Sequence, residues 1–452
     1  MTTRPTLEHP VTIAGAGLAG SLMAVYCAQR GWPVRVLEQR ADMRKHAMSA
    51  GRSINLALST RGLTALERVG LADDVLEMAI PMKGRQMHNV DGSTTFQPYG
   101  RPGEHINSVS RRGLNELLMS RAEDWPDVEF HFETTVHDVD LETGAVDVTF
   151  GDGRRERLDS ALVIGADGIW SAIRTRMQHT PRFDFSQTYL DHGYKEIELP
   201  PSPNGDFALE PNALHIWPRH DFMLIALPNP DRTFTCTLFL AFEGDDASFD
   251  ALADDAAIER FFHREFPDIV PLVPDLVEQF SANPTSPLAY IRCKPFHRGD
   301  RVVLIGDACH AVVPFYGQGM NAAFEDCRIL DELLTRWSIE RSGPAIAAYS
   351  ADRKADADAI SDLAVYNFLE MRSRVADEAF LNRKKVEAAL TEAFPEHFMS
   401  LYRMVTFSNR PYAEARDLAR QHTAMLDGTD GAETALLTLG VMRALAGAVP
   451  EA

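Results

Sequence analysis

The segment that most constrains the fold runs from residue 11 to residue 38 of the 452-residue chain. A short apolar stretch at 11–14 leads into the glycine-rich sequence GAGLAG at 15–20, and an apolar helical pattern follows. In such a unit the first glycine allows a tight turn, the second lets a phosphate approach the backbone, and the third lets the helix pack on the strand. A second apolar stretch, 34–37, ends at Glu38, whose carboxylate can accept hydrogen bonds from ribose hydroxyls. The segment predicts a Rossmann-type α/β fold that binds a dinucleotide.

Two further segments narrow the choice of dinucleotide. An acid at position 38 argues against the 2′-phosphate of NADP, which leaves NAD or FAD. Apolar residues 161–164 lead into GADGIWSAIR at 165–174, and apolar residues 302–305 lead into GDACHAVVPFYGQGMN at 306–321. In the latter, Asp307 ends a strand and a helix begins after the Gly-Gln-Gly turn, so the helix end favours negative charge. FAD suits this arrangement, because its ribityl chain offers hydroxyls and its ring system becomes anionic on reduction.

The order of these three motifs resembles the single-component aromatic-ring hydroxylases, flavoprotein monooxygenases that hold FAD and use NADPH without a second Rossmann domain. The resemblance narrows in four other stretches, which look like the kynurenine 3-monooxygenase family. These are GRSINLALS at 51–59, HGY at 192–194, EPNALHIWP at 210–218 and MVTFS at 404–408. The similarity extends from about residue 11 to about residue 412.

The resemblance implies FAD-dependent hydroxylation of L-kynurenine to 3-hydroxy-L-kynurenine with NADPH and O2, through a C4a-hydroperoxyflavin. Two alternatives stay open: a flavin hydroxylase of another aromatic acid, and a non-catalytic flavin-binding regulatory protein. The motifs and the resemblance together predict that FAD contacts Gly15, Gly17, Leu18, Ala19, Gly20, Glu38, Arg40, Arg52, Leu56, Arg111, Val136, Asp167, Gly168, Asp307, Pro314, Gly317, Gly319, Met320 and Asn321.

Three polar residues are candidates for holding a substrate carboxylate. Arg85 and Tyr99 fall in two short strands of an expected hairpin around Asp91-Gly92, and Asn367 is a polar amide in the apolar stripe of a helix. Taken singly, Arg85 is most simply a solvated charge, and Asn367 is equally an amide that caps nearby backbone. An arginine, a phenol and an amide that converge would nevertheless bind a carboxylate well. The resemblance implies that these three hold the amino-acid carboxylate of L-kynurenine.

Alternating apolar residues in three short strands, at 214–217, 222–227 and 234–240, predict an antiparallel sheet. One face of this sheet is either plain core or an apolar wall over the flavin that would hold an aromatic ring. The residues expected on that face are Leu214, Ile216, Met223, Ile225, Leu227, Thr237 and Phe239. The resemblance adds the substrate contacts Pro314, Phe315, Tyr316, Glu370, Met371 and Tyr402.

We expect the chain to have three parts. Residues 8–185 with 290–350 would form a discontinuous FAD-binding domain, and residues 75–105 with 186–289 a substrate-binding sheet domain. Residues 250–266 are expected to be helical within the second part. Residues 351–452 would form a C-terminal helical region.

Charge and cysteine content limit the cellular partners. The formal net charge of −20 argues against nucleic acid or an anionic membrane as a general partner. The five cysteines are odd in number and include no CxxC pair, so we expect free thiols in a reducing cytoplasm and no metal site. No stretch offers ~20 clean apolar residues. We therefore expect a soluble protein without the membrane anchor of animal family members, and an amphipathic helix at 435–449. Homodimerisation is left open.

Overall fold

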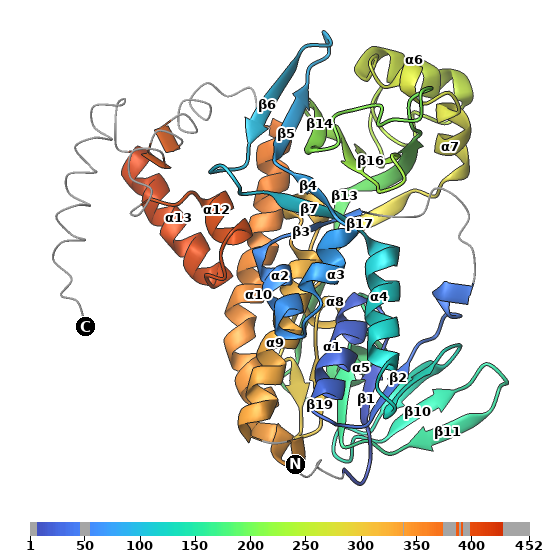
Figure 1. Ribbon diagram of the computed structural model, residues 1–452, viewed down its shortest axis with the longest axis vertical. Helices are drawn as coiled ribbons and strands as arrows, with labels where there is room; N and C mark the ends of the chain where they lie inside the picture. The colour runs from blue at the N-terminus through green and yellow to red at the C-terminus, as the bar shows by residue number, and fades with distance from the viewer. Residues whose placement is uncertain are drawn as a thin grey trace.

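The structure is a computed structural model that describes residues 7–45, 55–337, 339–373, 386–387, 390–391 and 398–427. The side chains of residues 340, 369–373 and 425–427 are not among those described. Two large sheets lie one above the other, and the long helix α10 (Ser342–Ser373) runs past both of them (Figure 1). Helices α12 (Leu401–Thr406) and α13 (Tyr412–Asp427) pack on the side of α10.

The lower sheet has six strands in the order β18-β19-β12-β1-β2-β8, and all neighbours are parallel except β18 and β19. Residue Ala14 at the end of β1 pairs with Gly165 of β12, which pairs with Leu304 of β19. Because parallel strands present their carboxyl ends at one edge, the three sequence motifs begin at neighbouring positions of that edge. The predicted Rossmann-type α/β fold is confirmed. The strands are β1 (Val11–Ala14), β2 (Val34–Leu37), β8 (Val128–His131), β12 (Leu162–Gly165), β18 (His297–Arg298) and β19 (Val302–Leu304).

The upper sheet has seven strands in the order β17-β13-β16-β15-β14-β5-β6. All its neighbouring strands are antiparallel except β14 and β5, which are parallel. The three predicted strands and the predicted hairpin at Asp91-Gly92 are confirmed. The bounds are β5 (Gly84–His88), β6 (Thr94–Pro98), β13 (Asp184–Leu199), β14 (Ala213–Arg219), β15 (Phe222–Pro228), β16 (Phe234–Ala241) and β17 (Ser286–Lys294).

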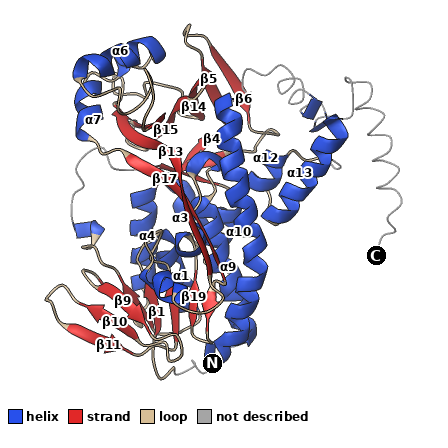
Figure 2. Cartoon of the chain, turned by 180° about the vertical axis from the view of Figure 1, so that it is seen from behind, coloured by secondary structure: helices blue, strands red, loops and turns tan. Residues whose placement is uncertain are grey.

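Alternation along these strands separates two apolar faces, as the pleat of a sheet requires. Leu224 and Leu238 pack in one core with residues of α6 and α7, which cover the outer face. Met223 and Phe239 pack instead with Phe315 from the lower part of the molecule. Figure 2 shows the two sheets and their covering helices from behind. The inner face of the upper sheet therefore looks toward the edge where the three motifs meet.

Smaller elements complete the two layers. One three-stranded sheet joins β3 (Asn55–Leu58), β7 (Ile106–Ser110) and β4 (Ile80–Met82), and another joins β11 (Arg155–Leu158), β10 (Val146–Thr149) and β9 (Thr135–Val139). The remaining helical elements are α1 (Leu18–Gln29), η1 (Met43–Lys45), α2 (Thr60–Arg68), α3 (Ala72–Glu77), α4 (Arg111–Glu123), α5 (Ala172–Gln178), α6 (Asp255–Glu265), η2 (Val270–Leu272), α7 (Leu276–Ala282), α8 (Asp307–His310), η3 (Pro314–Tyr316), α9 (Gly319–Trp337) and η4 (Ile339–Arg341).

One predicted helix starts later than expected. The prediction of a helix over 250–266 is wrong at its start, because α6 begins at Asp255. Asp254 has extended backbone, and its carboxylate accepts a hydrogen bond from the Ala257 N–H at 2.8 Å, so it caps the first turn. The division into three parts stays our proposal.

Within the described residues, no helix combines the length and the apolar character needed to cross a bilayer.

Candidate active site

The first motif can turn tightly because glycine stands at two positions where a side chain would clash with neighbouring backbone. Gly15 has φ +98°, and a Cβ atom there would lie 2.5 Å from the Ala166 carbonyl oxygen. A Cβ atom on Gly20 would lie 2.0 Å from the Gly15 carbonyl oxygen. At Gly17, by contrast, nothing lies within 4 Å of the position of a Cβ atom, so the backbone is open to an approaching group. This pattern is the one that a pyrophosphate needs at the start of α1.

Glu38 closes this turn from the end of β2. Its Oε2 accepts from the Ala16 N–H at 2.9 Å, and its Oε1 accepts from the N–H and Nε of Arg40 at 3.0 and 2.9 Å. Burial acts to raise the pKa of Glu38, but the bonds from Arg40 and Ala16 lower it below its ordinary value. The carboxylate is therefore ionised, and Oε2, which accepts only the bond from Ala16, keeps a lone pair for a further donor.

The second motif presents a buried acceptor. Asp167 Oδ2 accepts from the N–H groups of Ala172 and Ile173 at the start of α5, at 2.7 and 3.3 Å. Its Oδ1 is buried and has no hydrogen-bond partner within the described residues. Burial raises the pKa of Asp167. An unpartnered buried oxygen costs free energy, so this atom is suited to a ligand donor.

Arg174 ties the second motif to the third. Its guanidinium donates to the Ile169 carbonyl at 2.6 Å and to the Ala308 carbonyl in α8 at 2.8 Å. These bonds position Asp307, the first residue of α8. Its side chain is accessible to solvent but has many protein atoms around it. Burial raises the pKa of Asp307, and the positive charge of Arg111 acts in the opposite direction. Asp307 thus lies on a recessed surface within reach of the field of Arg111.

Asn321 fixes the Gly-Gln-Gly loop before α9. Its Oδ1 accepts from the Ser59 N–H at 2.9 Å, and its Nδ2 donates to the carbonyls of Ala57 and Gly317 at 2.8 and 2.9 Å. Asn321 is completely buried, and these three bonds engage its side chain with the protein. The loop is thereby attached to β3.

Arg85 stands among aromatic rings above this loop. Its guanidinium carbon lies 4.8 Å from the ring centre of Tyr402 and 5.6 Å from that of Tyr99. The rings of Tyr99 and Tyr402 stack at 5.3 Å, and Tyr316 stacks on Tyr402 at 6.0 Å. The simple reading of Arg85 as a solvated charge is wrong, because its Nε atom is buried.

Two polar atoms of this group have no hydrogen-bond partner of normal geometry in the described part of the chain: Arg85 Nε and the Tyr99 hydroxyl. Burial acts to lower the pKa of Arg85, but the nearby phenols of Tyr402, Tyr99 and Tyr316 raise it, so the guanidinium keeps its charge. Burial raises the pKa of Tyr99 well above its ordinary value, so its phenol keeps its proton. A cation and a neutral donor side by side, both short of partners, suit an anion.

Asn367 lies in α10, next to η3. Its Nδ2 donates to the Phe315 carbonyl at 2.7 Å, which is the backbone cap that the sequence left open. The ring of Phe315 stacks on Phe368 at 4.3 Å and lies 4.9 Å from Phe239. Together with Met223 and Ile225 of the upper sheet, these rings form an apolar wall over the loop.

Comparison with known proteins identifies the cofactor and the family. The family described as "FAD binding domain" matches residues 8–364. Kynurenine 3-monooxygenase of Myxococcus xanthus is 47% identical over 428 residues, which cover 93% of this chain and 90% of that protein. The enzymes of Dictyostelium discoideum (42% over 433 residues; 93% of each chain) and Sus scrofa (43% over 407 residues; 90% of this chain and 85% of that protein) are similar.

The chain belongs to the kynurenine 3-monooxygenase family. Like the family as a whole, it is an FAD-dependent monooxygenase. Among solved structures, 2-methyl-3-hydroxypyridine-5-carboxylic acid oxygenase has a TM-score of 0.66 at 21% identity, covering 83% of this chain and 95% of that one. P. aeruginosa PqsL in complex with 2-aminobenzoylacetate has a TM-score of 0.66 at 22% identity, covering 81% and 97%. These likenesses confirm the fold.

The residues present fit FAD, as expected for this family. The open backbone at Gly17 accommodates phosphates, the unpartnered Asp167 Oδ1 accommodates a donor, and Asp307 faces outward from the same sheet edge. The other predicted cofactor residues lie on the elements around this edge. Leu18 and Ala19 begin α1, Gly20 packs on Gly15, Arg40 follows β2, Leu56 is in β3, Arg111 begins α4, Val136 is in β9, Gly168 follows Asp167, and Pro314, Gly317, Gly319 and Met320 belong to η3, the loop and α9.

Some predicted residues of the kynurenine 3-monooxygenase site cannot be placed. Arg52 and residues 435–449 lie outside the described residues, and so do the side chains of Glu370 and Met371. Of the predicted wall, Met223, Ile225 and Phe239 contact one apolar cluster with Phe315, whereas Leu214, Leu227 and again Ile225 contact another with Tyr99 and Tyr402. Thr237 and Ile216 follow the alternation of Phe239 and Leu214 and are buried.

Sequence reasoning missed several side chains that contact the predicted site residues. Phe368 stacks on Phe315, and Tyr194 lies 6.3 Å from Phe239. Phe368 follows Asn367 directly, and Tyr194 belongs to the HGY stretch that carried the resemblance, so both were within reach of a sequence signal. The hydrogen bond from Tyr412 to Gln318 has no such signal, because 94 residues separate the two positions in the sequence.

Proposed function

We propose that this chain hydroxylates L-kynurenine to 3-hydroxy-L-kynurenine. In the balanced reaction, NADPH, a proton, O2 and L-kynurenine give NADP+, water and the hydroxylated product. The observation that carries the substrate assignment is the pair of unpartnered buried donors, Arg85 Nε and the Tyr99 hydroxyl, beside an aromatic wall. A substrate for this pocket needs both a carboxylate and an aromatic ring.

Arg85 and Tyr99 would bind the amino-acid carboxylate. The guanidinium stays charged because the surrounding phenols raise its pKa, and its planar fork matches a carboxylate with two parallel hydrogen bonds. The Tyr99 hydroxyl supplies a neutral donor at the same point. Tyr402 packs against both and holds the guanidinium in place.

The aniline ring would lie against the wall of Phe239, Phe315, Met223 and Ile225. The amine nitrogen of the substrate donates electron density to the ring carbon ortho to it, so that carbon is already nucleophilic. Asn367 holds the backbone of η3 at Phe315 and so fixes the wall on which the ring rests. The wall thereby decides which carbon of the ring faces the cofactor.

FAD, when bound, carries electrons from NADPH to O2 and delivers one oxygen atom to the ring. The protein orients the ring and excludes water, which would divert the oxygen to H2O2. The buried aromatic and aliphatic side chains between the upper sheet and η3 serve this purpose. For FAD itself we propose that Glu38 accepts from ribose hydroxyls, that the backbone at Gly17 faces the pyrophosphate, and that Asp167 and Asp307 accept from hydroxyls of the cofactor, Asp307 from those of the ribityl chain.

Product analysis tests this proposal directly. The purified holoenzyme is incubated with NADPH, isotopically heavy O2 and L-kynurenine, and the products are identified by mass. We expect a product one labelled oxygen atom heavier than L-kynurenine. Faster NADPH oxidation with simple phenols than with L-kynurenine would point to a hydroxylase of another aromatic compound. A bound flavin that NADPH never reduces, with or without L-kynurenine, would refute an enzymatic role.

The cellular compartment, the reductant and the domain division of the enzyme are also proposals. All five cysteines are unpaired and buried, which supports a reducing cytoplasm. We propose NADPH rather than NADH as the reductant. Homodimerisation stays open, and analytical sedimentation of the purified protein would decide it. In the proposed three-part division, Arg85 and Tyr99 belong to the substrate-binding sheet domain and the cofactor lies in the FAD-binding domain.

A further inference from the structure

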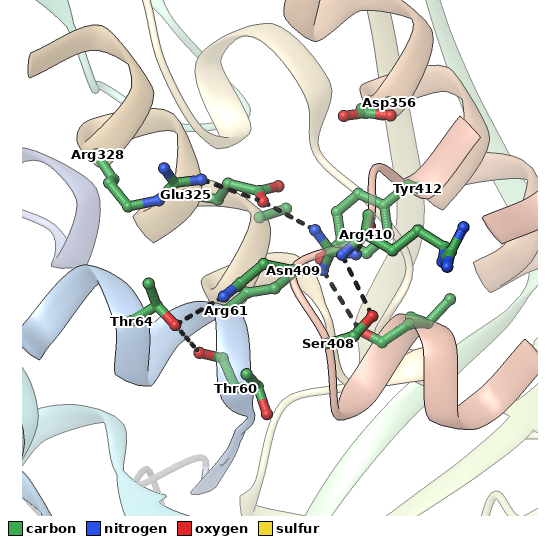
Figure 3. A network of polar contacts seen from close by, with 12 residues as sticks. Thr60, Arg61, Thr64, Glu325, Arg328, Asp356, Ser408, Asn409, Arg410 and Tyr412 are labelled. Atoms are coloured by element: carbon green, nitrogen blue, oxygen red, sulfur yellow. Dashed lines mark hydrogen bonds and ion pairs between the residues drawn. The ribbon is translucent and has the colours of Figure 1, made fainter. Parts of the chain in front are cut away.

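A buried network of charges joins the cofactor part of the molecule to the C-terminal helices (Figure 3). Arg61 of α2 is completely buried, and its Nη1 donates to Glu325 Oε1 of α9 at 2.8 Å. The same guanidinium donates to the carbonyls of Val405, at 3.3 Å, and of Arg410. One side chain thus binds two backbone carbonyls of a segment more than 340 residues away in sequence.

The network continues to the third flavin motif. Arg353 of α10 donates to Glu325 Oε2 at 2.9 Å and to Asp326 Oδ1 at 2.8 Å. Asp326 Oδ2 accepts from the Gly306 N–H at 2.9 Å and contacts His310 Nε2 at 2.5 Å. Burial acts to raise the pKa of Asp326, but His310 and Arg353 lower it to about 2, so this carboxylate is ionised.

This bonding also accounts for a group that resembles a metal site. Cys309, His310 and Asp326 bring possible ligand atoms within 4.8 Å of one another. Both Asp326 oxygens, however, already accept hydrogen bonds from Arg353, Gly306 and His310. The chemistry of this group is that of an ion pair.

Tyr412, the first residue of α13, makes a second connection. Its ring lies 3.8 Å from the guanidinium carbon of Arg61, and its hydroxyl donates to Gln318 Oε1 at 2.9 Å. Gln318 is the central residue of the Gly-Gln-Gly loop and is 2% exposed. The C-terminal segment therefore bonds directly to the loop that precedes α9.

The Gly-Gln-Gly loop and the C-terminal segment also meet at the edge of the proposed substrate pocket. Tyr316, two residues before Gln318, stacks on Tyr402 of α12 at 6.0 Å. Arg403, next to Tyr402, pairs with Glu104 at 2.5 Å and so holds α12 from the other side. The loop and the C-terminal segment are thus joined twice, once by Tyr316 and Tyr402 in the pocket and once by Gln318 and Tyr412 behind it.

We propose that Tyr412 and Gln318 are positioning residues for the hydroxylation. The charge network fixes the C-terminal segment on the cofactor part, and the Tyr412–Gln318 hydrogen bond sets the distance between Tyr402 and Tyr316 across the pocket. This inference rests on the proposed function, because it assigns Tyr402 to the substrate pocket. Its consequence is that a change behind the pocket loosens the fit of the substrate over the flavin without removing a substrate contact.

The test compares two substitutions that each remove one buried phenol hydroxyl from the holoenzyme. Tyr412→Phe removes the bond to Gln318 and keeps the ring on Arg61. Tyr26→Phe is the matched control, since the Tyr26 hydroxyl donates to the Ala65 carbonyl at 2.7 Å in the cofactor part and Tyr26 is 3% exposed. The measurements are FAD content, the KM for L-kynurenine, and the share of oxidised NADPH that yields hydroxylated product rather than H2O2.

For Tyr412→Phe we expect unchanged FAD content, a higher KM and a product yield per NADPH lower by about threefold to 100-fold, because misplacement of the substrate by ~1 Å can cost that much. Tyr26→Phe should keep the KM and yield of the wild type. The double variant Tyr412→Phe/Gln318→Leu should be no worse than Gln318→Leu alone, since both substitutions break one bond. Equal losses in Tyr412→Phe and Tyr26→Phe, or none in Tyr412→Phe, would overturn the proposal.

A spectroscopic measurement separates this inference from the proposed function. The fluorescence and visible circular dichroism of the bound flavin are recorded without any substrate. Tyr412→Phe should change these spectra and Tyr26→Phe should not, whichever aromatic acid the wild-type enzyme hydroxylates. Identical spectra for Tyr412→Phe and the wild type would refute a positioning role, whereas failure of the wild type to hydroxylate L-kynurenine would refute only the substrate assignment.

Discussion

Replacing Arg85 with methionine is expected to weaken substrate binding without weakening the fold. Arg85 Nε is buried and lacks a hydrogen-bond partner within the described residues, and such an orphaned donor costs about 1–3 kcal/mol of folding free energy. Methionine has a similar length and no donor, so it removes this cost. It also removes the attraction of the guanidinium to the rings of Tyr402 and Tyr99, worth about 0.5–1 kcal/mol each. The net change in the free energy of unfolding therefore lies between a loss of about 1 kcal/mol and a gain of about 2 kcal/mol.

The effect on the substrate has the opposite sign. Removing one partner of a buried charged pair costs about 2–5 kcal/mol of binding free energy. Since 1.4 kcal/mol is a factor of ten, the KM for L-kynurenine should rise about 30-fold to several thousand-fold. Arg85→Lys, which keeps the charge and loses the planar fork, should give an intermediate KM.

Steady-state kinetics at matched FAD content give the KM, and urea unfolding of the same preparations gives the stability. The combination of a higher KM with an unchanged or higher free energy of unfolding is specific to a residue kept for binding. An unchanged KM would refute the carboxylate assignment. A loss of more than about 1 kcal/mol in stability would refute the claim that Arg85 lacks a partner in the fold.

Three other predictions concern the surroundings of the site. Asn321→Ala should lose about 2–4 kcal/mol of stability and weaken FAD binding, because it leaves the Ser59 N–H and Ala57 carbonyl without partners; thermal melting and ultrafiltration measure both. Burial raises the pKa of Glu196 from 4.5 to about 7, so wild-type stability falls as pH rises through this window, and Glu196→Gln should be more stable at pH ~8 by up to about 3 kcal/mol in urea unfolding. Burial lowers the pKa of His215 from 6.5 to about 4, so the wild type loses stability as pH falls through that window. Between these pH values, His215→Gln should lose up to about 3 kcal/mol less free energy of unfolding than the wild type does.

Each of these three predictions has a result that would contradict it. Wild-type FAD affinity in Asn321→Ala would show that β3 does not hold the loop. Parallel curves of stability against pH for Glu196→Gln and the wild type would mean that Glu196, which lines a cavity of about 240 Å³ between β13 and the turn after β15, titrates as an ordinary surface acid. Parallel curves of stability against pH for His215→Gln and the wild type would mean that the His215 ring takes up its proton inside the fold as readily as in the unfolded chain.

The local structure that the sequence predicted correctly is the part that carries local signals. The turn of Gly15, Gly17 and Gly20, and the acid at position 38 lie within one β–turn–α–β unit, and the residue types alone require its geometry. The inner face of the upper sheet followed from the alternation of Met223 and Ile225 along β15, since a strand has a period of two. The start of α6 was missed because a capping Asp254 competes with the apolar pattern that extends beyond it.

Residues whose environment depends on distant segments could not be assigned from pattern. Arg85 read alone was a solvated charge, and only its approach to Tyr402, more than 300 residues later, makes it a buried cation. Asn367 was equally a ligand or a cap; the structure shows that it caps the Phe315 carbonyl, and its contact with a substrate carboxylate stays a prediction. Arg61 carried no signal at all, because a buried arginine differs from a surface one only in the partners that the fold brings to it.

The sequence by itself determined FAD as the cofactor and the turns at which we propose that it binds. Backbone turns that need glycine, a strand that ends in an acid, and a helix that starts at a loop are properties of short segments, so they are written in consecutive residues. The tertiary structure decided the surroundings of Arg85, where we propose that the substrate binds, and their connection to the C-terminal helices. The physical reason is that desolvated charges and unpartnered donors exist only when several remote segments exclude water from one point.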